Sequence, residues 1–497
     1  MDVPRPSSAV VLTRGGGREL EVFLVRRAPA LRFLGGYWAF PGGVVDPMDG
    51  VAGEEEDGST ATRCAIRELF EETGVLPSSL AAAIAPAQRE ALREELARPG
   101  AVVPRWRELL AATPGALAEL TRFARLTTPP FSRLRYRTDF FHLALPPGEA
   151  PDFAAGELVA GRFWRPAELL AAWRAGDLHV SPPTLMQLGL DAGRGAEAWL
   201  AACRRECGRL EAGRLESVRQ APGILALPLR TPTPPPGIST STYLVGEERV
   251  WIVDPAPVDE GERARLLEIT DEWHREGRSF AGVLLTHHHP DHVGAAELVA
   301  ARYGLSVHAH PWTLAHLPFR PRDPRPLFDG DELDLGTAPT GTPRWRLRAL
   351  HTPGHAPGHL AFLESRYRAL IAGDMLATGS TILIDPPEGH LATYLASLRR
   401  LARERIGTLH PAHGMPHLDG PALVGQYLAH RREREEKLRA ALAATPRSLG
   451  ELVAVVYDDT PVELHPLARR SLLAGLEKLR DEGRAAEAEG GWRAGGQ

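Results

Sequence analysis

Residues 286–292 read Thr286-His287-His288-His289-Pro290-Asp291-His292 and follow the short apolar run Val283-Leu284-Leu285. Residues two apart share one face of an extended strand, so the imidazoles of His287 and His289 can reach a single ion. The proline ends the strand, and the aspartate and the last histidine then begin a helix predicted over residues 292–303. Four ligand-type side chains within six residues at a strand end predict a metal site.

Further imidazoles and one carboxylate follow later predicted strands. They lie in His351-Thr352-Pro353-Gly354-His355, in Gly373-Asp374 and in His410-Pro411-Ala412-His413-Gly414. Imidazole and carboxylate ligands without thiolates suit Zn²⁺, Mn²⁺ or Fe²⁺ sites that keep a position open for water. Two ions that share a carboxylate lower the pKa of a shared water and favour hydrolysis.

The motifs HxHxDH, TPGH, GD and PxHG, in this order over roughly residues 222–425, resemble the metallo-β-lactamase superfamily. The resemblance implies an αββα sandwich with two zinc ions, or Mn²⁺ or Fe²⁺ in their place. By position, one metal would be held by His287, His289 and His355, and the other by Asp291, His292 and His413, with Asp374 bridging and Asp291 also catalytic. His288 is expected to face away from the metals, and His351 and His410 are expected to have supporting roles.

The substrate of this half is open between two classes. Leu227-Pro228 through Tyr243-Leu244-Val245, and the helix at residues 430–435, resemble the lactamase-like endoribonuclease subgroup, which carries a C-terminal winged-helix-like module. That resemblance implies cleavage of single-stranded RNA. However, residues 426–497 hold 12 Arg and Lys against 12 Asp and Glu, whereas nucleic-acid modules are usually basic. A packing or lid role for this module and an acyl-thioester substrate such as acyl-coenzyme A are the alternatives.

A second motif lies in a helix predicted at about residues 60–73, Arg67-Glu68-Leu69-Phe70-Glu71-Glu72-Thr73-Gly74-Val75. Glu68, Glu71 and Glu72 stand at i, i+3 and i+4, and therefore on one helix face. Like charges so placed repel one another unless a cation lies among them, and hard oxygen ligands favour Mg²⁺ or Mn²⁺.

This segment resembles the second half of the Nudix box, REUxEExGU, with Phe40-Pro41-Gly42-Gly43 as its approach, and the resemblance covers about residues 5–190. It implies an α/β/α sandwich that hydrolyses a nucleoside-diphosphate pyrophosphate. Glu68, Glu71 and Glu72 would bind the metal, with Glu68 also as base and Arg67 orienting them. A non-catalytic nucleotide- or RNA-binding module is the alternative for this head.

The first half of the Nudix box departs from the pattern. The segment from Val44 to Thr62 carries an acidic insertion, and Asp46 is expected to replace the missing glutamate. With a helical insert predicted over residues 79–125, this resembles the coenzyme A diphosphatase subgroup. Glu157 is expected to supply one more carboxylate from a loop.

A chain of 497 residues is too long for one hydrophobic core. We expect a multidomain α/β and α+β protein: a Nudix domain at 1–190, a helical linker at 191–221, a metallo-β-lactamase domain at 222–425 and a winged-helix-like module at 426–497. The two lysines, Lys437 and Lys478, exclude a P-loop or Schiff-base lysine from the first four-fifths of the chain.

Three cysteines, an N-terminus without a signal pattern and the lack of a long apolar run favour a cytoplasmic protein without membrane partners. The net charge of −5 gives no overall basic field for nucleic acid. The expected partners are a small-molecule pyrophosphate and either single-stranded RNA or acyl-coenzyme A.

Overall fold

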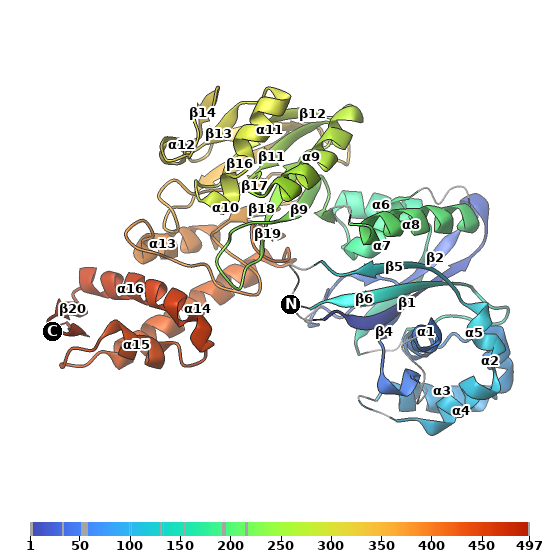
Figure 1. Ribbon diagram of the computed structural model, residues 1–497. Helices are drawn as coiled ribbons and strands as arrows, with labels where there is room; N and C mark the ends of the chain where they lie inside the picture. The colour runs from blue at the N-terminus through green and yellow to red at the C-terminus, as the bar shows by residue number, and fades with distance from the viewer. Residues whose placement is uncertain are drawn as a thin grey trace. The chain divides into compact units, whose positions relative to one another are not determined.

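The computed structural model describes residues 3–31, 34–50, 58–98, 100, 102–129, 132, 134–153, 156–190, 195–213 and 217–495. Residues 51–57, part of the segment that carries the predicted acidic insertion, lie outside this set. The chain divides into two compact units, Met1–Pro222 and Gly223–Gln497 (Figure 1). No helix among the described residues has the length and apolar content needed to cross a membrane.

A mixed sheet forms the centre of the first unit, with strand order β3-β2-β1-β6-β5 and with β4 and β7 paired to β1 and β2. β1 runs parallel to β6 and antiparallel to β2 and β4. The strands are β1 (Arg5–Arg14), β2 (Glu21–Arg27), β3 (Trp38–Ala39), β4 (Gly42–Val44), β5 (Thr121–Thr127), β6 (Tyr136–Ala144) and β7 (Leu158–Trp164). β8 (Val218–Ala221) ends the unit.

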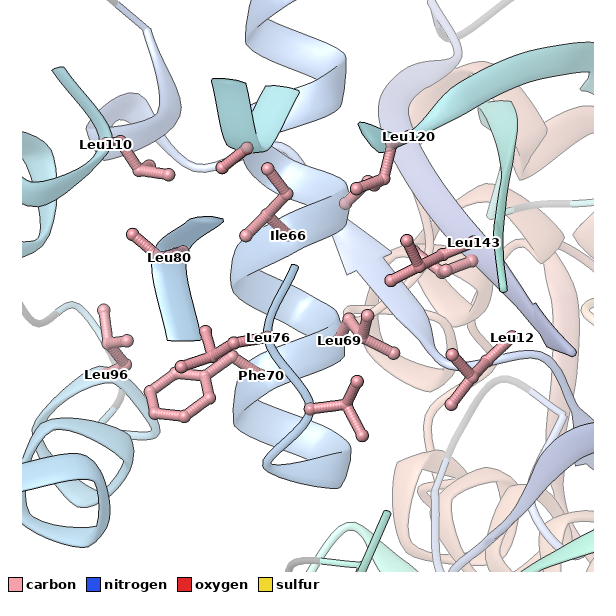
Figure 2. Packing of buried hydrophobic residues seen from close by; sticks show 14 of the residues in the cluster. Leu12, Ile66, Leu69, Phe70, Leu76, Leu80, Leu96, Leu110, Leu120 and Leu143 are labelled. Carbon is pink, nitrogen blue, oxygen red and sulfur yellow. The ribbon is translucent and has the colours of Figure 1, made fainter. Parts of the chain in front are cut away.

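Helices cover both faces of this sheet, because alternate residues of β1 point to opposite sides. Leu12 packs with Ile66 and Leu69 of α1 on one side (Figure 2), and Val11 packs with Trp199 of α8 on the other. The helices are α1 (Gly58–Thr73), α2 (Ser78–Ala83), α3 (Pro86–Leu96), α4 (Pro104–Ala112), α5 (Gly115–Glu119), α6 (Pro166–Ala175), α7 (Pro182–Gly189) and α8 (Ala196–Glu211), with 3-10 turns η1 (Gly17–Glu19) and η2 (Pro47–Asp49). The expected α/β/α sandwich is confirmed.

Two sheets form the body of the second unit. One has the order β14-β13-β12-β11-β10-β9, and the other has the order β15-β16-β17-β18-β19. Their strands are β9 (Ile224–Arg230), β10 (Ser239–Val245), β11 (Arg249–Val253), β12 (Ser279–Leu284), β13 (Val307–Ala309), β14 (Pro324–Pro326), β15 (Glu332–Gly336), β16 (Trp345–His351), β17 (Leu360–Glu364), β18 (Leu370–Gly373) and β19 (Leu409–Pro411).

Helices lie against both sheets of this unit, which confirms the predicted αββα arrangement. Leu350, Leu363 and Leu370 of the second sheet pack with Leu398 of α13 and Val424 of α14 in one buried cluster. The helices are α9 (Glu260–Arg275), α10 (Pro290–Val293), α11 (Ala296–Tyr303), α12 (Pro311–Ala315), α13 (Leu391–Leu401) and α14 (Gly420–Ala441).

The C-terminal module has a core of its own. Leu438 from the end of α14 packs with Leu452 of α15, Leu476 of α16 and Trp492 of β21. Its elements are α15 (Leu449–Val456), the 3-10 turn η4 (Val462–Leu464), α16 (His465–Asp481), β20 (Ala485–Ala488) and β21 (Gly491–Ala494). The two last strands, β20 and β21, pair as an antiparallel hairpin.

Two element predictions are corrected by the structure. The helix expected at 292–303 is two helices, α10 and α11, because the intervening backbone packs against the chain after β11: a Cβ on Gly294 would lie 2.6 Å from the Ala256 carbonyl oxygen. The helical insert expected at 79–125 ends early, since residues from Thr121 onward pair with β6 as strand β5.

Candidate metal centres

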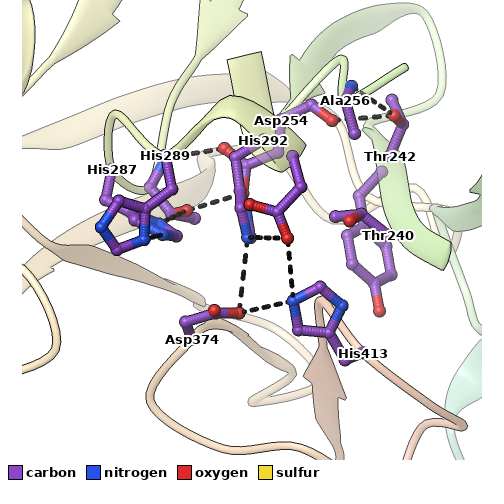
Figure 3. A network of polar contacts seen from close by, with 12 residues as sticks. Thr240, Thr242, Asp254, Ala256, His287, His289, His292, Asp374 and His413 are labelled. Atoms are coloured by element: carbon purple, nitrogen blue, oxygen red, sulfur yellow. Dashed lines mark hydrogen bonds and ion pairs between the residues drawn. The ribbon is translucent and has the colours of Figure 1, made fainter. Parts of the chain in front are cut away.

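The ends of several strands bring the ligand-type residues of the second unit together. The parallel strands β11 and β12 end side by side, so Asp254 lies next to the segment that begins at Thr286. β18 ends at Gly373, directly before Asp374, and β19 ends two residues before His413. Segments far apart in the chain therefore meet at one place, as Figure 3 shows.

Three imidazoles form the first ligand group. His289 Nδ1 lies 2.9 Å from His287 Nε2 and 3.0 Å from His355 Nε2, and the three ligand atoms lie within 4.8 Å of one another. Ligand atoms around a tetrahedral ion with bonds of about 2.0–2.1 Å lie roughly 3.3 Å apart. The three nitrogens are therefore spaced as the ligands of one ion.

A second group shares Asp374 with the first. His413 Nε2 lies 3.2 Å from Asp374 Oδ1 and 3.6 Å from Asp291 Oδ2, and His292 Nε2 lies 3.5 Å from Asp374 Oδ1 (Figure 3). The other oxygen of Asp374, Oδ2, lies 3.4 Å from His355 Nε2 in the first group. Asp374 therefore stands between the two groups, where a bridging carboxylate would be.

The Nδ1 atoms of four of these imidazoles are held by groups outside the cluster. The partners are Thr286 Oγ1 for His287 (3.0 Å), Asp254 Oδ2 for His292 (2.9 Å), the Leu383 carbonyl for His355 (2.9 Å) and the Ser239 carbonyl for His413 (3.0 Å). A proton held at Nδ1 leaves Nε2 free as a metal ligand, and such partners orient ligand rings.

Two buried polar atoms at the centre of the cluster lack a hydrogen-bond partner within the described part of the chain and are suited to bind a cation. His292 Nε2 and Asp374 Oδ1 are buried and have no hydrogen-bond partner among the described residues. A buried polar atom without a partner costs free energy, and a shared metal ion would satisfy both. The donor set, five imidazoles and two carboxylates without a thiolate, suits Zn²⁺, Mn²⁺ or Fe²⁺.

Burial and the charges of neighbouring side chains shift the pKa values of the histidines in the metal-free cluster. Burial and the neighbouring imidazoles hold the pKa of His287 well below its usual value, and burial chiefly lowers the pKa of His355 to about 4. For His292, burial opposes the charge, but Asp374 and Asp291 outweigh it and raise the pKa. Burial likewise opposes the charge of His413, but Asp374 outweighs it and raises the pKa. His287 and His355 are therefore the imidazoles that are neutral and ready to ligate at neutral pH.

Three supporting residues were missed in the sequence. Asp254 accepts hydrogen bonds from the Thr286 backbone N–H (2.7 Å) and hydroxyl (2.6 Å) as well as facing His292. The buried His359 accepts a bond from the Asp374 backbone N–H through Nε2 (3.0 Å). Glu388 lies beside His288, with Oε1 3.4 Å from Nε2. Each is an isolated residue outside the quoted motifs.

The remaining histidines of the motifs lie outside both ligand groups. His351 Nε2 donates to the Pro357 carbonyl (2.9 Å), and His410 Nε2 contacts Thr408 Oγ1 (3.0 Å). His288 joins neither of these two groups, but it lies with His289 and Glu388 in a further set of possible ligand atoms.

In the first unit, Arg67 is the centre of the acidic site. Its guanidinium binds Asp49 through two bonds of 2.8 Å, and its Nη1 contacts Glu68 (2.9 Å) and Glu71 (3.1 Å). Asp49 is buried, as is Arg67. Asp46, the expected substitute for the missing glutamate, instead caps η2 by accepting a bond from the Met48 N–H. Asp49 is thus the carboxylate that Arg67 holds.

The carboxylates of α1 are strongly desolvated. Burial raises the pKa of Glu71 to about 7 and that of Glu72 to about 8, and the charge of Glu68 adds to both shifts. Burial also raises the pKa of Glu68, and Glu157 contributes to the shifts of Glu68 and Glu72, so its charge acts on the same site. A divalent cation among these carboxyl groups would lower their pKa values again, because its charge favours the ionised form.

The Gly42-Gly43 pair allows the close approach of these acids. The Gly42 N–H donates to Glu72 Oε2 (2.9 Å), and a Cβ on Gly43 would lie 2.4 Å from the Glu68 carboxylate. The backbone of β4 therefore supports two of the three expected metal ligands.

Comparison with known proteins matches three family models to the chain. Residues 234–413 match the family model for the metallo-beta-lactamase superfamily, residues 448–492 that for the beta-lactamase associated winged helix domain, and residues 3–182 that for the NUDIX domain. The lactamase-like protein vrtG of Penicillium aethiopicum is 32% identical over 245 residues, 46% of this chain and 73% of that protein. The chain belongs to the metallo-β-lactamase superfamily and carries an N-terminal NUDIX domain.

Other relatives match less of their own length. The lactamase-like protein adaB of Aspergillus niger is 31% identical over 217 residues, and the thioesterase pkgB of Emericella nidulans is 34% identical over 208 residues. These matches cover 43% and 41% of this chain, but only 61% and 54% of the relatives. A beta-lactamase domain protein from Burkholderia ambifaria, 23% identical, has the same fold over 57% of this chain and 94% of its own, with a TM-score of 0.50.

Proposed function

We propose that the chain is a hydrolase with two heads: a dinuclear metallohydrolase in the second unit that cleaves acyl thioesters, and a Mg²⁺- or Mn²⁺-dependent NUDIX diphosphatase in the first. The observation that carries the first part is the ligand set around Asp374, in which two groups of converging ligand atoms share one carboxylate. Two divalent ions held there would polarise the bond under attack and lower the pKa of the attacking water.

The residues of the chain prepare this site in three ways. The outer partners of the ligand imidazoles fix their rings before substrate binds, as Asp254 does for His292. Asp374 is held by the backbone bond to His359. Asp291 and His413 lie within 3.6 Å of each other and close the second group.

The choice of a thioester rests on charge and on relatives. A thioester needs no extended basic surface, and residues 426–497 have a net charge of zero, which does not favour an RNA backbone. Relatives named as thioesterases include pkgB and the atrochrysone carboxyl ACP thioesterase of Passalora fulva. Single-stranded RNA, which the sequence resemblance implies, is the competing substrate.

A substrate comparison tests the second head. Purified protein is assayed against an acyl-coenzyme A, by release of free thiol, and against a single-stranded RNA oligonucleotide. We expect thiol release, and we expect His287→Ala to reduce it by more than the roughly 100-fold typical of residues that only support a ligand. RNA cleavage that depends on His287, with no thiol release, would reject the thioester proposal in favour of a nuclease.

For the NUDIX head, the supporting arrangement is Arg67 held between Asp49 and the carboxylates of α1. In the wild type, water would add to one phosphorus of the pyrophosphate bond of coenzyme A or of a nucleoside-diphosphate derivative, and two phosphomonoesters would form. We expect Glu71→Gln to abolish this hydrolysis. If wild type shows no such hydrolysis with any pyrophosphate in Mg²⁺ or Mn²⁺, but still binds nucleotide, the head is a binding module. The fusion of the two heads suggests that both act on the same acyl-coenzyme A, and that result would reject this idea.

A further inference from the structure

The segment of residues 382–389 runs past His289 and His355, two ligands of the first metal group. The Leu383 carbonyl accepts the Nδ1–H of His355 (2.9 Å). Further along, Glu388 Oε2 lies 3.6 Å from His289 Nε2 and Glu388 Oε1 lies 3.4 Å from His288 Nε2. We call this segment the strap.

Glu388 lies next to Nε2 of His289, the ring nitrogen that does not face the other ligands. His289 turns Nδ1 toward His287 and His355, so Nε2 is its remaining nitrogen, and the other four imidazoles each have a fixed group at the corresponding place. A negative charge at this distance favours the tautomer that keeps the proton on Nε2 and leaves Nδ1 free to ligate. His288, the histidine of the motif outside the ligand set, shares the same carboxylate.

The strap is itself fixed from two sides. On one side, the N–H of His390, the residue directly after the strap, donates to the Gly354 carbonyl (2.8 Å), beside the ligand His355. On the other, Arg470 of α16 binds Asp385 with an Nε–Oδ1 distance of 2.8 Å. Arg431 of α14 also donates to the Ile382 carbonyl. The helices α14 and α16 therefore hold the segment that touches two ligand imidazoles.

We propose that Glu388 is a positioning residue for His289, and that the C-terminal module braces the first metal group through the strap. The proposal rests on the metal centre of the proposed function, but not on the identity of its substrate. It also gives the net-neutral C-terminal module a task other than RNA binding.

The test is the rate at which the metal-loaded chain loses metal to an excess of a chromophoric chelator, measured without substrate. Glu388→Gln keeps the size of the side chain but removes its charge. We expect it to retain two ions at equilibrium and to release the faster one about 10–100-fold sooner than wild type. Glu404→Gln, whose carboxylate pairs with Arg348 instead, is the matched control and should leave the rate unchanged.

The brace is tested by a charge exchange at the module. Arg470→Asp should speed release by up to about fivefold, since the pair is half-exposed, and the double variant Arg470→Asp, Asp385→Arg should restore the wild-type rate. Arg469→Asp, on the neighbouring position of the same helix, controls for charge alone.

Three results would overturn the proposal. Release at the wild-type rate by both Glu388→Gln and Glu388→Ala would remove the positioning role. If Glu388→Gln bound one ion fewer than wild type while the other variants kept their ions, Glu388 would be a metal ligand. A changed KM with unchanged release would make it a substrate contact. A wild-type chain that binds no metal would instead reject the proposed function itself.

Discussion

At the scale of single residues, the proposed ligands of the second unit could be selected from the sequence because each lies in a short motif. The residues that support them could not. Asp254 follows Val253 as an isolated aspartate, 32 positions before Thr286, and only the parallel pairing of β11 with β12 brings the two together. The same holds for Asp49, which meets Arg67 through the η2 turn rather than through the spacing of the Nudix box.

Asp254→Asn is expected to weaken metal binding. The amide nitrogen would face either the Thr286 backbone N–H at the place of Oδ1, or both the Thr286 hydroxyl and the Nδ1–H of His292 at the place of Oδ2, so at least one of these contacts is lost. We expect the affinity of the second metal position to fall about 10–100-fold and the unfolding free energy of the metal-free protein to fall by about 1–3 kcal/mol. Equilibrium competition with a chelator and urea unfolding measure the two effects.

The control for that experiment is Asp271→Asn, an aspartate paired with Arg302 at the surface. It should change neither quantity by much. Equal metal affinity in Asp254→Asn and wild type would show that the carboxylate does not support the site.

His308 on β13 gives a pH prediction away from both metal centres. Burial, with a contribution from Arg325, lowers the pKa of its imidazole to about 4, and its ring packs edge-on against Trp251. The folded state thus binds fewer protons than the unfolded chain between about pH 4 and the ordinary histidine pKa of about 6.5. The stability from His308 is therefore full above this window and is lost as the pH falls through it.

We expect the unfolding free energy of the metal-free protein to decrease more steeply below pH 6.5 in wild type than in His308→Gln. Denaturant unfolding at several pH values in the presence of a chelator measures the difference. Parallel pH profiles for the two proteins would contradict the shift.

At the scale of elements, the helix of the Nudix motif and the strand before Thr286 could be predicted from the sequence, but two other boundaries depended on tertiary contacts. β5 lies at the end of an Ala-, Leu- and Arg-rich stretch and is a strand because β6 pairs with it. The break between α10 and α11 follows from the close packing of Gly294 on the chain after β11. The Ala256 carbonyl that Gly294 approaches is far from it in sequence.

The β4–α1 contact in the NUDIX domain predicts the effect of Gly43→Ala. The new Cβ would lie 2.4 Å from the Glu68 carboxylate, which is the free end of a side chain and can move away. We expect the diphosphatase activity to fall at least tenfold because Glu68 leaves its place, while the unfolding free energy changes by less than about 1 kcal/mol. Activity and urea unfolding are measured together.

Gly16→Ala is the matched control, since a Cβ there meets no atom within 4 Å. Full diphosphatase activity in Gly43→Ala would mean that the position of Glu68 is not needed.

At the scale of the whole molecule, the family models and the two compact units agree that the chain joins a NUDIX domain to a metallo-β-lactamase domain. The sequence could predict both families, because the motifs of each are local. It could not decide the substrate of either head, since substrate choice depends on the surfaces around the motifs.

Separate expression of residues 1–222 and 223–497 should give two folded proteins, because each unit has its own buried clusters. We expect each fragment to show a cooperative thermal transition, and the second to retain its metal through gel filtration. An unfolded second fragment would show that its core depends on the first unit.

The most direct measurement of the central claim, two independent metal-dependent heads, is a crossed assay of two variants in the full chain. Glu72→Gln should abolish pyrophosphate hydrolysis and leave thioester hydrolysis at the wild-type rate, whereas His292→Ala should do the reverse. Loss of both activities in either variant, or of neither in both, would contradict the account.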